Sequence, residues 1–89
     1  MAALWIVLLT AEDGGRAFNV IVHEDEREVA EATAVAALVE DGWRDVRAMR
    51  SGSISDPRLA DAKVEFQEAA SAAREFGWSM IRYRPTNLV

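Results

Sequence analysis

The residues of this chain that could do acid–base or metal chemistry gather at one place. The single histidine, His23, is followed directly by Glu24, Asp25 and Glu26. Imidazole and carboxylate groups are ligands for divalent metals. Three adjacent side chains seldom aim at one point, however, and these acids precede a predicted helix, where negative charge opposes the positive end of the helix dipole. We therefore expect helix-end electrostatics here and predict no metal site.

No other catalytic or cofactor motif is present in the sequence. The chain has no cysteine, which excludes disulfides, thiolate nucleophiles and zinc knuckles. The segment Ser51-Gly52-Ser53 has the composition of a phosphate-binding loop but lacks the Walker spacing and its lysine. An aspartate that follows it, Asp56, would repel an anion. The sequence therefore favours a protein that is not an enzyme and predicts no cofactor.

Length and charge bound the class of protein. With 89 residues, of which 51% are hydrophobic, we expect one folded domain over residues 1–89. The net charge of −5 argues against binding to nucleic acid or to an anionic membrane. The apolar start, Met1–Leu9, lacks the basic region of a secretory signal and is too short to cross a bilayer. Together with the absence of cysteine, this predicts a cytoplasmic protein.

Hydrophobic periodicity and turn residues divide the chain into four strands and two helices. Strands are predicted at 4–9, 18–23, 43–49 and 78–84, and helices at 25–40 and 57–76. An Asp-Gly-Gly turn at 13–15 favours a hairpin between the first two strands. Gly42 and Gly77 are placed to end the helices, and Asp56 with Pro57 to begin the second.

The resulting order, ββαβαβ, predicts an α/β (α+β) fold of two layers. We expect a mixed four-stranded sheet with both helices on one face, because crossover connections between parallel strands are right-handed. The first predicted strand, Leu4–Leu9, is continuously apolar. Such a run is typical of a strand that is covered on both faces.

A helix–Gly-Trp–strand unit occurs twice in the chain. A shift of thirty-five residues superposes Gly42-Trp43 on Gly77-Trp78 and also aligns Arg47 with Arg82. The chain is rich in alanine, so the alanine matches carry little weight. A true duplication and the chance similarity of two such units both remain open.

Strand alternation places the large side chains of both units on one side of their strands. We call this set the Trp/Met/Arg face: Trp43, Arg47, Met49, Trp78, Met80, Arg82 and Arg84. Trp, Met and Arg are enriched at protein interfaces. We expect the face either to be uncovered and to bind a partner, or to be absent because each Trp folds over the preceding helix and closes the core.

The preferred interpretation is a small acidic interaction module that forms a homodimer through the Trp/Met/Arg face. A second contact region, the acidic surface, would bind a basic protein: Glu24, Asp25, Glu26, Glu28 and Glu31. By analogy of size and charge, a stoichiometric inhibitor or regulator of the kind carried by phages and mobile elements fits this description. The alternative is a dimeric small-molecule-binding or enzymatic domain. Its pocket for an anionic ligand would lie between the sheets and be lined by Trp43, Trp78, Arg47 and Arg82.

Overall fold

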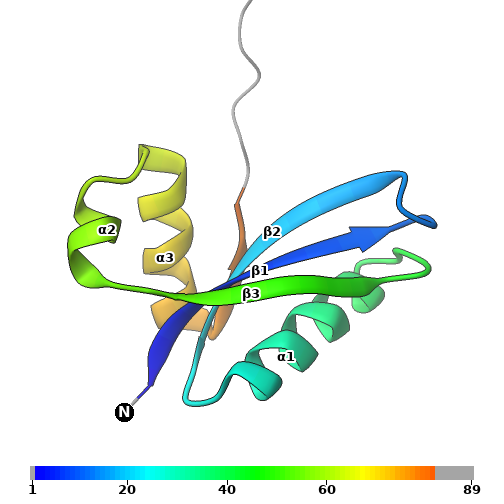
Figure 1. The fold of residues 1–89 in the computed structure, drawn as a ribbon, viewed down its shortest axis with the longest axis horizontal. Helices are drawn as coiled ribbons and strands as arrows, with labels where there is room; N and C mark the ends of the chain where they lie inside the picture. Colours follow the sequence, from blue (N-terminus) through cyan, green and yellow to red (C-terminus); the bar gives the residue numbers. More distant parts are fainter. Residues whose placement is uncertain (1, 82–89) are drawn as a thin grey trace, which may run out of the picture.

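The computed structural model describes residues 2–81 and shows an α+β fold with a four-stranded antiparallel sheet and three helices (Figure 1). The elements in chain order are β1 (Ala3–Ala11), β2 (Arg16–Glu24), α1 (Arg27–Glu40), β3 (Arg47–Ile54), α2 (Asp56–Ala60), α3 (Val64–Phe76) and β4 (Trp78–Met80). The end of the last predicted strand, with Arg82 and Arg84, lies outside the described residues.

The predicted hairpin is confirmed and forms the centre of the sheet. β1 and β2 pair antiparallel along their full length, from Ala3 opposite Glu24 to Ala11 opposite Arg16. β3 adds to the free edge of β1, and β4 adds to the free edge of β2, so the strand order is β3-β1-β2-β4.

All strand pairs are antiparallel, so the prediction of a mixed sheet is wrong. The helical connections do not place each new strand beside the strand that precedes it. After β2 the chain crosses β1 and adds β3 on the far side, and after β3 it crosses the hairpin again to add β4. Each outer strand therefore neighbours a strand that runs in the opposite direction.

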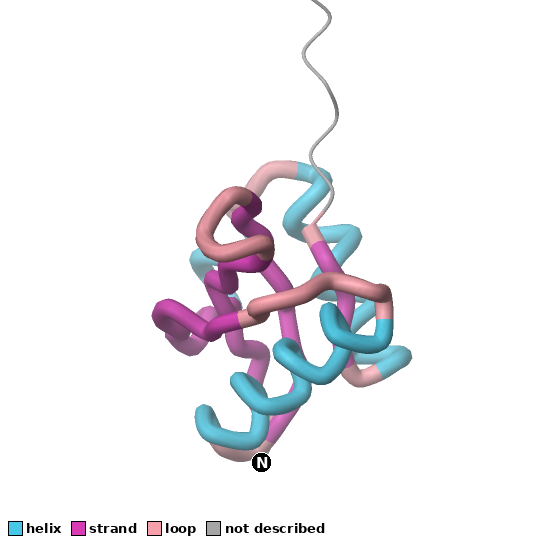
Figure 2. Tube along the Cα trace, turned by 90° about the vertical axis from the view of Figure 1, so that its right-hand side faces the viewer, coloured by secondary structure: helices cyan, strands magenta, loops and turns pink. Residues whose placement is uncertain are grey.

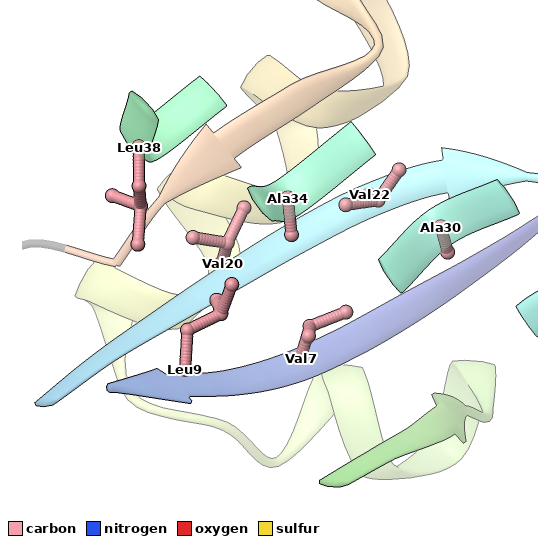
Figure 3. Close-up of a cluster of buried hydrophobic side chains, with 7 residues drawn as sticks. All are labelled: Val7, Leu9, Val20, Val22, Ala30, Ala34 and Leu38. Carbon is pink, nitrogen blue, oxygen red and sulfur yellow. The ribbon is translucent and has the colours of Figure 1, made fainter. Parts of the chain in front are cut away.

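Helix α1 packs on one face of the hairpin (Figure 3). The buried side chains of this contact form one apolar cluster: Val7, Leu9, Val20, Val22, Ala30, Ala34 and Leu38. The helix presents two alanines and one leucine to the sheet, which allows close approach of the backbone. Its predicted range of 25–40 is nearly that observed.

Helix α3 packs on the opposite face. Its buried alanines belong to a second cluster: Leu4, Ile21, Ala69, Ala70, Ala73 and Ile81. Successive residues of a strand point to opposite faces, so Ile21 lies on the side away from Val20 and Val22. The prediction of two helices on one face is therefore wrong, and the hairpin is covered from both sides. This agrees with the two-sided burial that the apolar run in β1 indicates.

Two predicted boundaries differ from the structure. β3 begins at Arg47 rather than at Trp43 and includes the predicted loop around Gly52, because this segment pairs with β1. The second predicted helix is two helices, α2 and α3. At the break, Gln67 Nε2 donates to the carbonyl oxygens of Ala60 (3.2 Å) and Ala62 (2.9 Å). None of the helices in residues 2–81 is long and apolar enough to cross a membrane.

Adjacent residues near the end of α1 offer a matched test of the packing. Leu38 is fully buried, whereas the side chain of Val39 is 54% exposed. We expect Leu38→Ala to lower the free energy of unfolding by about 3 kcal/mol, and Val39→Ala to lower it by less than about 0.5 kcal/mol. Urea denaturation followed by circular dichroism measures both values. Equal losses would contradict the packing of α1 described above.

Candidate interaction surfaces

Trp43 lies in the connection between α1 and β3 rather than in a strand. Gly42 has a φ of 94°, which ends the helix in the left-handed region. Its N–H donates to the Val39 carbonyl oxygen (3.0 Å), and the N–H of Trp43 donates to the Leu38 carbonyl oxygen (3.1 Å). This is the bonding pattern of a Schellman motif, which turns the chain back over the last turn of the helix.

The side chain of Trp43 closes the α1 side of the core. It packs against the α1 cluster, and its ring centroid lies 4.8 Å from that of Phe18, with the ring planes tilted by 57°. Its Nε1 donates to Asp41 Oδ2 (3.2 Å), and the Arg16 guanidinium lies 5.9 Å from the ring centroid. For Trp43, therefore, the structure matches the alternative in which the indole folds over its helix and closes the core.

Trp78 follows the second helix stop and takes a different path. Gly77 also has a positive φ, 98°, and its N–H donates to the Ala73 carbonyl oxygen (2.7 Å). This single bond is the simpler αL ending. Trp78 then begins β4 and pairs opposite Val22, and 38% of its side chain is exposed. The two Gly-Trp units thus both end helices, but they place their tryptophans differently.

The predicted Trp/Met/Arg face is not assembled within the described residues. Arg47 and Met49 lie on β3, whereas Trp78 and Met80 lie on β4, at the opposite edge of the sheet. The central hairpin separates the two groups. Within the described residues of one chain, Trp78 and Arg47 border different hollows, and Trp43 borders neither of them. The alternative pocket, which would lie between the sheets of two copies, stays a prediction. Met49 is 58% exposed beside an irregularity in the β1–β3 register.

Part of the predicted face forms a different surface at the β4 edge. Figure 2 shows this short strand, which leads into the grey trace, between α1 and α3. A hollow of about 220 Å³ lies there, lined by Ala37, Asp41, Ala72, Phe76, Trp78, Ser79 and Met80. We name Phe76, Trp78 and Met80 the aromatic edge. Phe76 is 73% exposed, the largest exposed fraction among the large apolar side chains of residues 2–81.

The hydrogen bonds between β2 and β4 define which backbone groups of β4 are open. The N–H of His23 donates to the Gly77 carbonyl oxygen (2.9 Å), and the N–H of Ile81 donates to that of Asn19 (2.8 Å). Because bonded residues alternate along an antiparallel strand, Ser79 also bonds toward β2. The N–H and C=O groups of Trp78 and Met80 therefore point outward, away from the sheet.

The predicted acidic surface is divided between solvent and structural contacts. Asp25, Glu26 and Glu28 are exposed at the start of α1. The carbonyl oxygen of Glu24 accepts a bond from Trp5 Nε1 (2.9 Å), and its Oε1 accepts one from the Asp25 N–H (3.0 Å). Glu31 Oε2 accepts from Ser51 Oγ (3.2 Å), which joins α1 to β3. Only the first three acids are open to a partner.

The cluster around His23 shows no metal-binding arrangement. His23 lies near the end of β2, half-buried, and borders a hollow that also contacts Ser55, Asp56 and Arg74. Asp56 forms an ion pair with Arg74 at 3.5 Å. Over the part of the chain that the structure describes, no three His, Asp or Glu side chains are grouped to hold a metal ion.

A second hollow, which the sequence analysis missed, lies beside β3. Its volume is about 510 Å³, and it is lined by Ile6, Leu8, Asn19, Arg50, Ser51, Gly52 and Arg58. Neither Arg50 nor Arg58 belongs to the predicted site residues. The alternation of β3 could have placed Arg50 on the same side as Leu8, but only with the correct strand boundaries and the pairing with β1.

Comparison of the chain with protein-family models, with curated proteins and with solved structures gives no match. The candidate functional surfaces are therefore those of the structure itself: the aromatic edge, the acidic surface and the hollow beside β3. Of these, the aromatic edge and the acidic surface contain residues that the sequence singled out.

The different roles of the two tryptophans can be measured. We expect Trp43→Ala to lower the free energy of unfolding by about 2 kcal/mol or more, because the truncation opens the core beside Phe18. Trp78→Ala should cost less than about 1 kcal/mol in the isolated chain, because its side chain is partly exposed already. Urea denaturation of both variants checks this, at a concentration where both have the same oligomeric state. A larger loss in Trp78→Ala would reverse the assignment.

Proposed function

We propose that this chain is a non-enzymatic protein-interaction module that forms a homodimer through the aromatic edge. The observation that carries the proposal is the exposure of Phe76 (73%) and Trp78 (38%) beside the open backbone of β4. Contiguous exposed apolar groups of this kind mark interaction sites in monomeric proteins. Aromatic side chains at the centre of an interface commonly supply most of its binding energy.

The edge of β4 is complementary to itself. Two copies of β4 can pair antiparallel around a two-fold axis at Ser79, with Trp78 opposite Met80 of the second copy. Each of the two Trp78–Met80 pairs would then exchange both backbone hydrogen bonds, since these are the residues whose N–H and C=O groups point outward. A two-fold interface uses the same patch on both copies, which this register satisfies.

The side chains support the same register. Trp78 and Met80 lie opposite Val22 and Val20, so both belong to the α1 side of the sheet. In the paired strands each indole would lie across from the methionine of the other copy, at a Cβ separation of about 5 Å. Contacts between methionine sulfur and aromatic rings are favourable. The four side chains would form one apolar cluster across the axis.

Small residues flank the edge where the helices of two copies would meet. The hollow at β4 is lined by Ala37 of α1 and Ala72 of α3. Packed helices lie about 8–10 Å apart, and the smaller values require small side chains at the contact. Among the described residues that line the hollow, only Asp41 is charged, and its Oδ2 already accepts a bond from Trp43 Nε1.

The small size of the core favours a partner as well. A chain of 89 residues buries only about 60–65% of its unfolded surface. Both clusters rely on alanines from the helices, with two in the α1 cluster (Ala30 and Ala34) and three in the α3 cluster (Ala69, Ala70 and Ala73). Burial of Phe76 and Trp78 in a dimer would add the large apolar area that these helices do not supply.

The acidic surface supplies the second contact in this proposal. Asp25, Glu26 and Glu28 are all exposed at the start of α1, in a chain whose net charge is −5. Their field would steer a basic protein toward this end of the molecule. A dimer would present the surface twice, which raises the affinity for a partner with two sites. An inhibitor or regulator that works by occupying a basic partner in the cytoplasm fits these properties.

The dimer can be tested with matched charge substitutions. Phe76→Glu and Trp78→Glu should each weaken the dimer at least tenfold. Trp78→Glu would bury a carboxylate in the apolar cluster, and Phe76→Glu would place one beside it, in the hollow that Phe76 lines with Trp78 and Met80. Met49→Glu is the control, since Met49 is also apolar and, at 58%, lies between Phe76 and Trp78 in exposure, but it is on β3 at the other edge. Sedimentation equilibrium measures the dissociation constant against the 9.8 kDa mass of one chain.

Two results would contradict the proposed dimer. The first is a wild-type chain that stays monomeric at millimolar concentration, and the second is a dimer that Met49→Glu disrupts as much as Phe76→Glu does. Circular dichroism of each variant shows whether its fold is retained. Since Phe76 is largely exposed, Phe76→Glu keeps the test valid even where Trp78→Glu unfolds the chain.

The acidic surface has its own test. Affinity capture with the wild-type chain should enrich a basic protein at low salt, and both high salt and the triple variant Asp25→Asn, Glu26→Gln, Glu28→Gln should abolish the enrichment. The variant Asp13→Asn, Asp61→Asn, Glu75→Gln changes the net charge equally at exposed positions elsewhere. Equal loss of enrichment in both triple variants would show a non-specific charge effect and contradict this part of the proposal.

A further inference from the structure

Part of the sheet face on which α3 packs is left open. α3 packs over Leu4, Ile21 and Ile81, near one end of the hairpin. Ile6, which packs against the edge of this cluster, and Leu8, farther along β1, are only half-buried. Both lie on the α3 side, since they alternate with the buried Val7, which faces α1. An apolar strip of the sheet is therefore accessible next to α2 and α3.

The strand register brings polar and basic groups to the same strip. Asn19 of β2 and Arg50 of β3 are both directly opposite Leu8, and Gly52 is opposite Ile6. Arg58 comes from α2, a separate element that borders the same hollow of about 510 Å³. Two arginines from different elements thus border a hollow that the aliphatic side chains of Ile6 and Leu8 also line.

Neither arginine has a carboxylate partner. Within residues 2–81, no ion pair involves Arg50 or Arg58, although the chain has fifteen acidic residues and ten basic ones. None of the described residues that line the hollow is acidic. In a protein with net charge −5, two arginines without an ion-pair partner that border one hollow form a local positive site that complements an anion.

Gly52 keeps the floor of the hollow clear. A Cβ atom built at this position meets no atom within 4 Å, so the absence of a side chain is not required by packing. Glycine inside a strand weakens it, and its presence often marks the close approach of a ligand or of another backbone. Here the open space beside Gly52 is continuous with the hollow that Ile6 and Leu8 line.

We propose that this hollow binds a small amphipathic anion, with an aliphatic body over Ile6 and Leu8 and one acidic group paired with Arg50 and Arg58. The guanidinium fork matches a carboxylate or a phosphate bidentately. Among residues 2–81, those that line the hollow include no aromatic ring, so they offer no platform for stacking a nucleobase. Its lining differs completely from that of the aromatic edge, so binding here and dimerisation can be tested separately.

Isothermal titration calorimetry of the full chain with single-chain amphiphiles, below their micelle concentration, tests the site. Octanoate and octyl phosphate are titrated separately, which distinguishes a carboxylate from a phosphate ligand. We expect one molecule of at least one of them to bind per chain. Octanol, which lacks the charge, and inorganic phosphate, which lacks the aliphatic body, should each bind at least tenfold more weakly.

Three variants locate the binding and one serves as a control. Arg50→Gln and Arg58→Gln should each weaken binding about tenfold, the effect of one charge-assisted hydrogen bond. Gly52→Val should abolish binding by filling the floor while it leaves the fold intact, because the position has room for a side chain and valine favours strands. Arg44→Gln removes the same charge from an exposed arginine outside the hollow and should leave the affinity unchanged.

Four results would overturn the proposal. They are no binding of either amphiphile at millimolar concentration, equal binding of octanol, unchanged affinity in a folded Gly52→Val variant, and equal loss in Arg44→Gln. Binding to vesicles of anionic phospholipid with none to octanoate or octyl phosphate would also contradict it, since a membrane surface would then be the partner. Circular dichroism of each variant verifies the fold.

Discussion

Burial of the central hairpin on both of its faces is the constraint on which the rest of this structure depends. β1 buries Val7 and Leu9 on one side and Leu4 on the other, and β2 buries Val20 and Val22 on one side and Ile21 on the other. A sheet that is apolar on both faces cannot leave either face wholly in water. The chain therefore needs one helix for each face, and it supplies α1 and α3 in that order.

The placement of the helices leads directly to the two unlike edges of the sheet. α1 carries the chain across β1 to a long outer strand, β3, and α3 returns it across the hairpin to the short β4. Each helix contacts the sheet through small alanine side chains, so it lies close to the strands and covers a limited area. Part of the α3 face therefore remains open beside Arg50, and the β4 edge keeps its aromatic residues exposed.

Local pattern was sufficient for the hairpin, for α1 and for both glycine helix stops, because turn chemistry and periodicity act over a few residues. The strand order was not accessible in this way. Nothing in the residues near Ser51 indicates that they pair with β1, since Ser-Gly-Ser has the composition of a turn and only the partner strand makes it part of β3. The wrong boundaries of β3 also affected the predicted site residues, because they placed Trp43 in a strand and left Arg50 outside it. The sequence places Asp25, Glu26 and Glu28 at the start of a helix, where the structure also has them, but the hydrogen bonds of Glu24 to Trp5 and of Glu31 to Ser51 depend on long-range packing.

The two Gly-Trp units show how one hydrogen bond separates a core residue from a surface residue. After Gly42 the N–H of Trp43 returns to the Leu38 carbonyl oxygen, and this bond holds the indole over the helix and against Phe18. α3 ends with the hydrogen bond that the Gly77 N–H donates to the Ala73 carbonyl oxygen. The N–H of the next residue, Trp78, points away from β2. The same dipeptide thus closes the core in one case and leaves both a backbone edge and an aromatic ring open in the other. Since a free strand edge beside exposed aromatic rings invites another strand, the form of this helix ending is what makes self-association at β4 physically available.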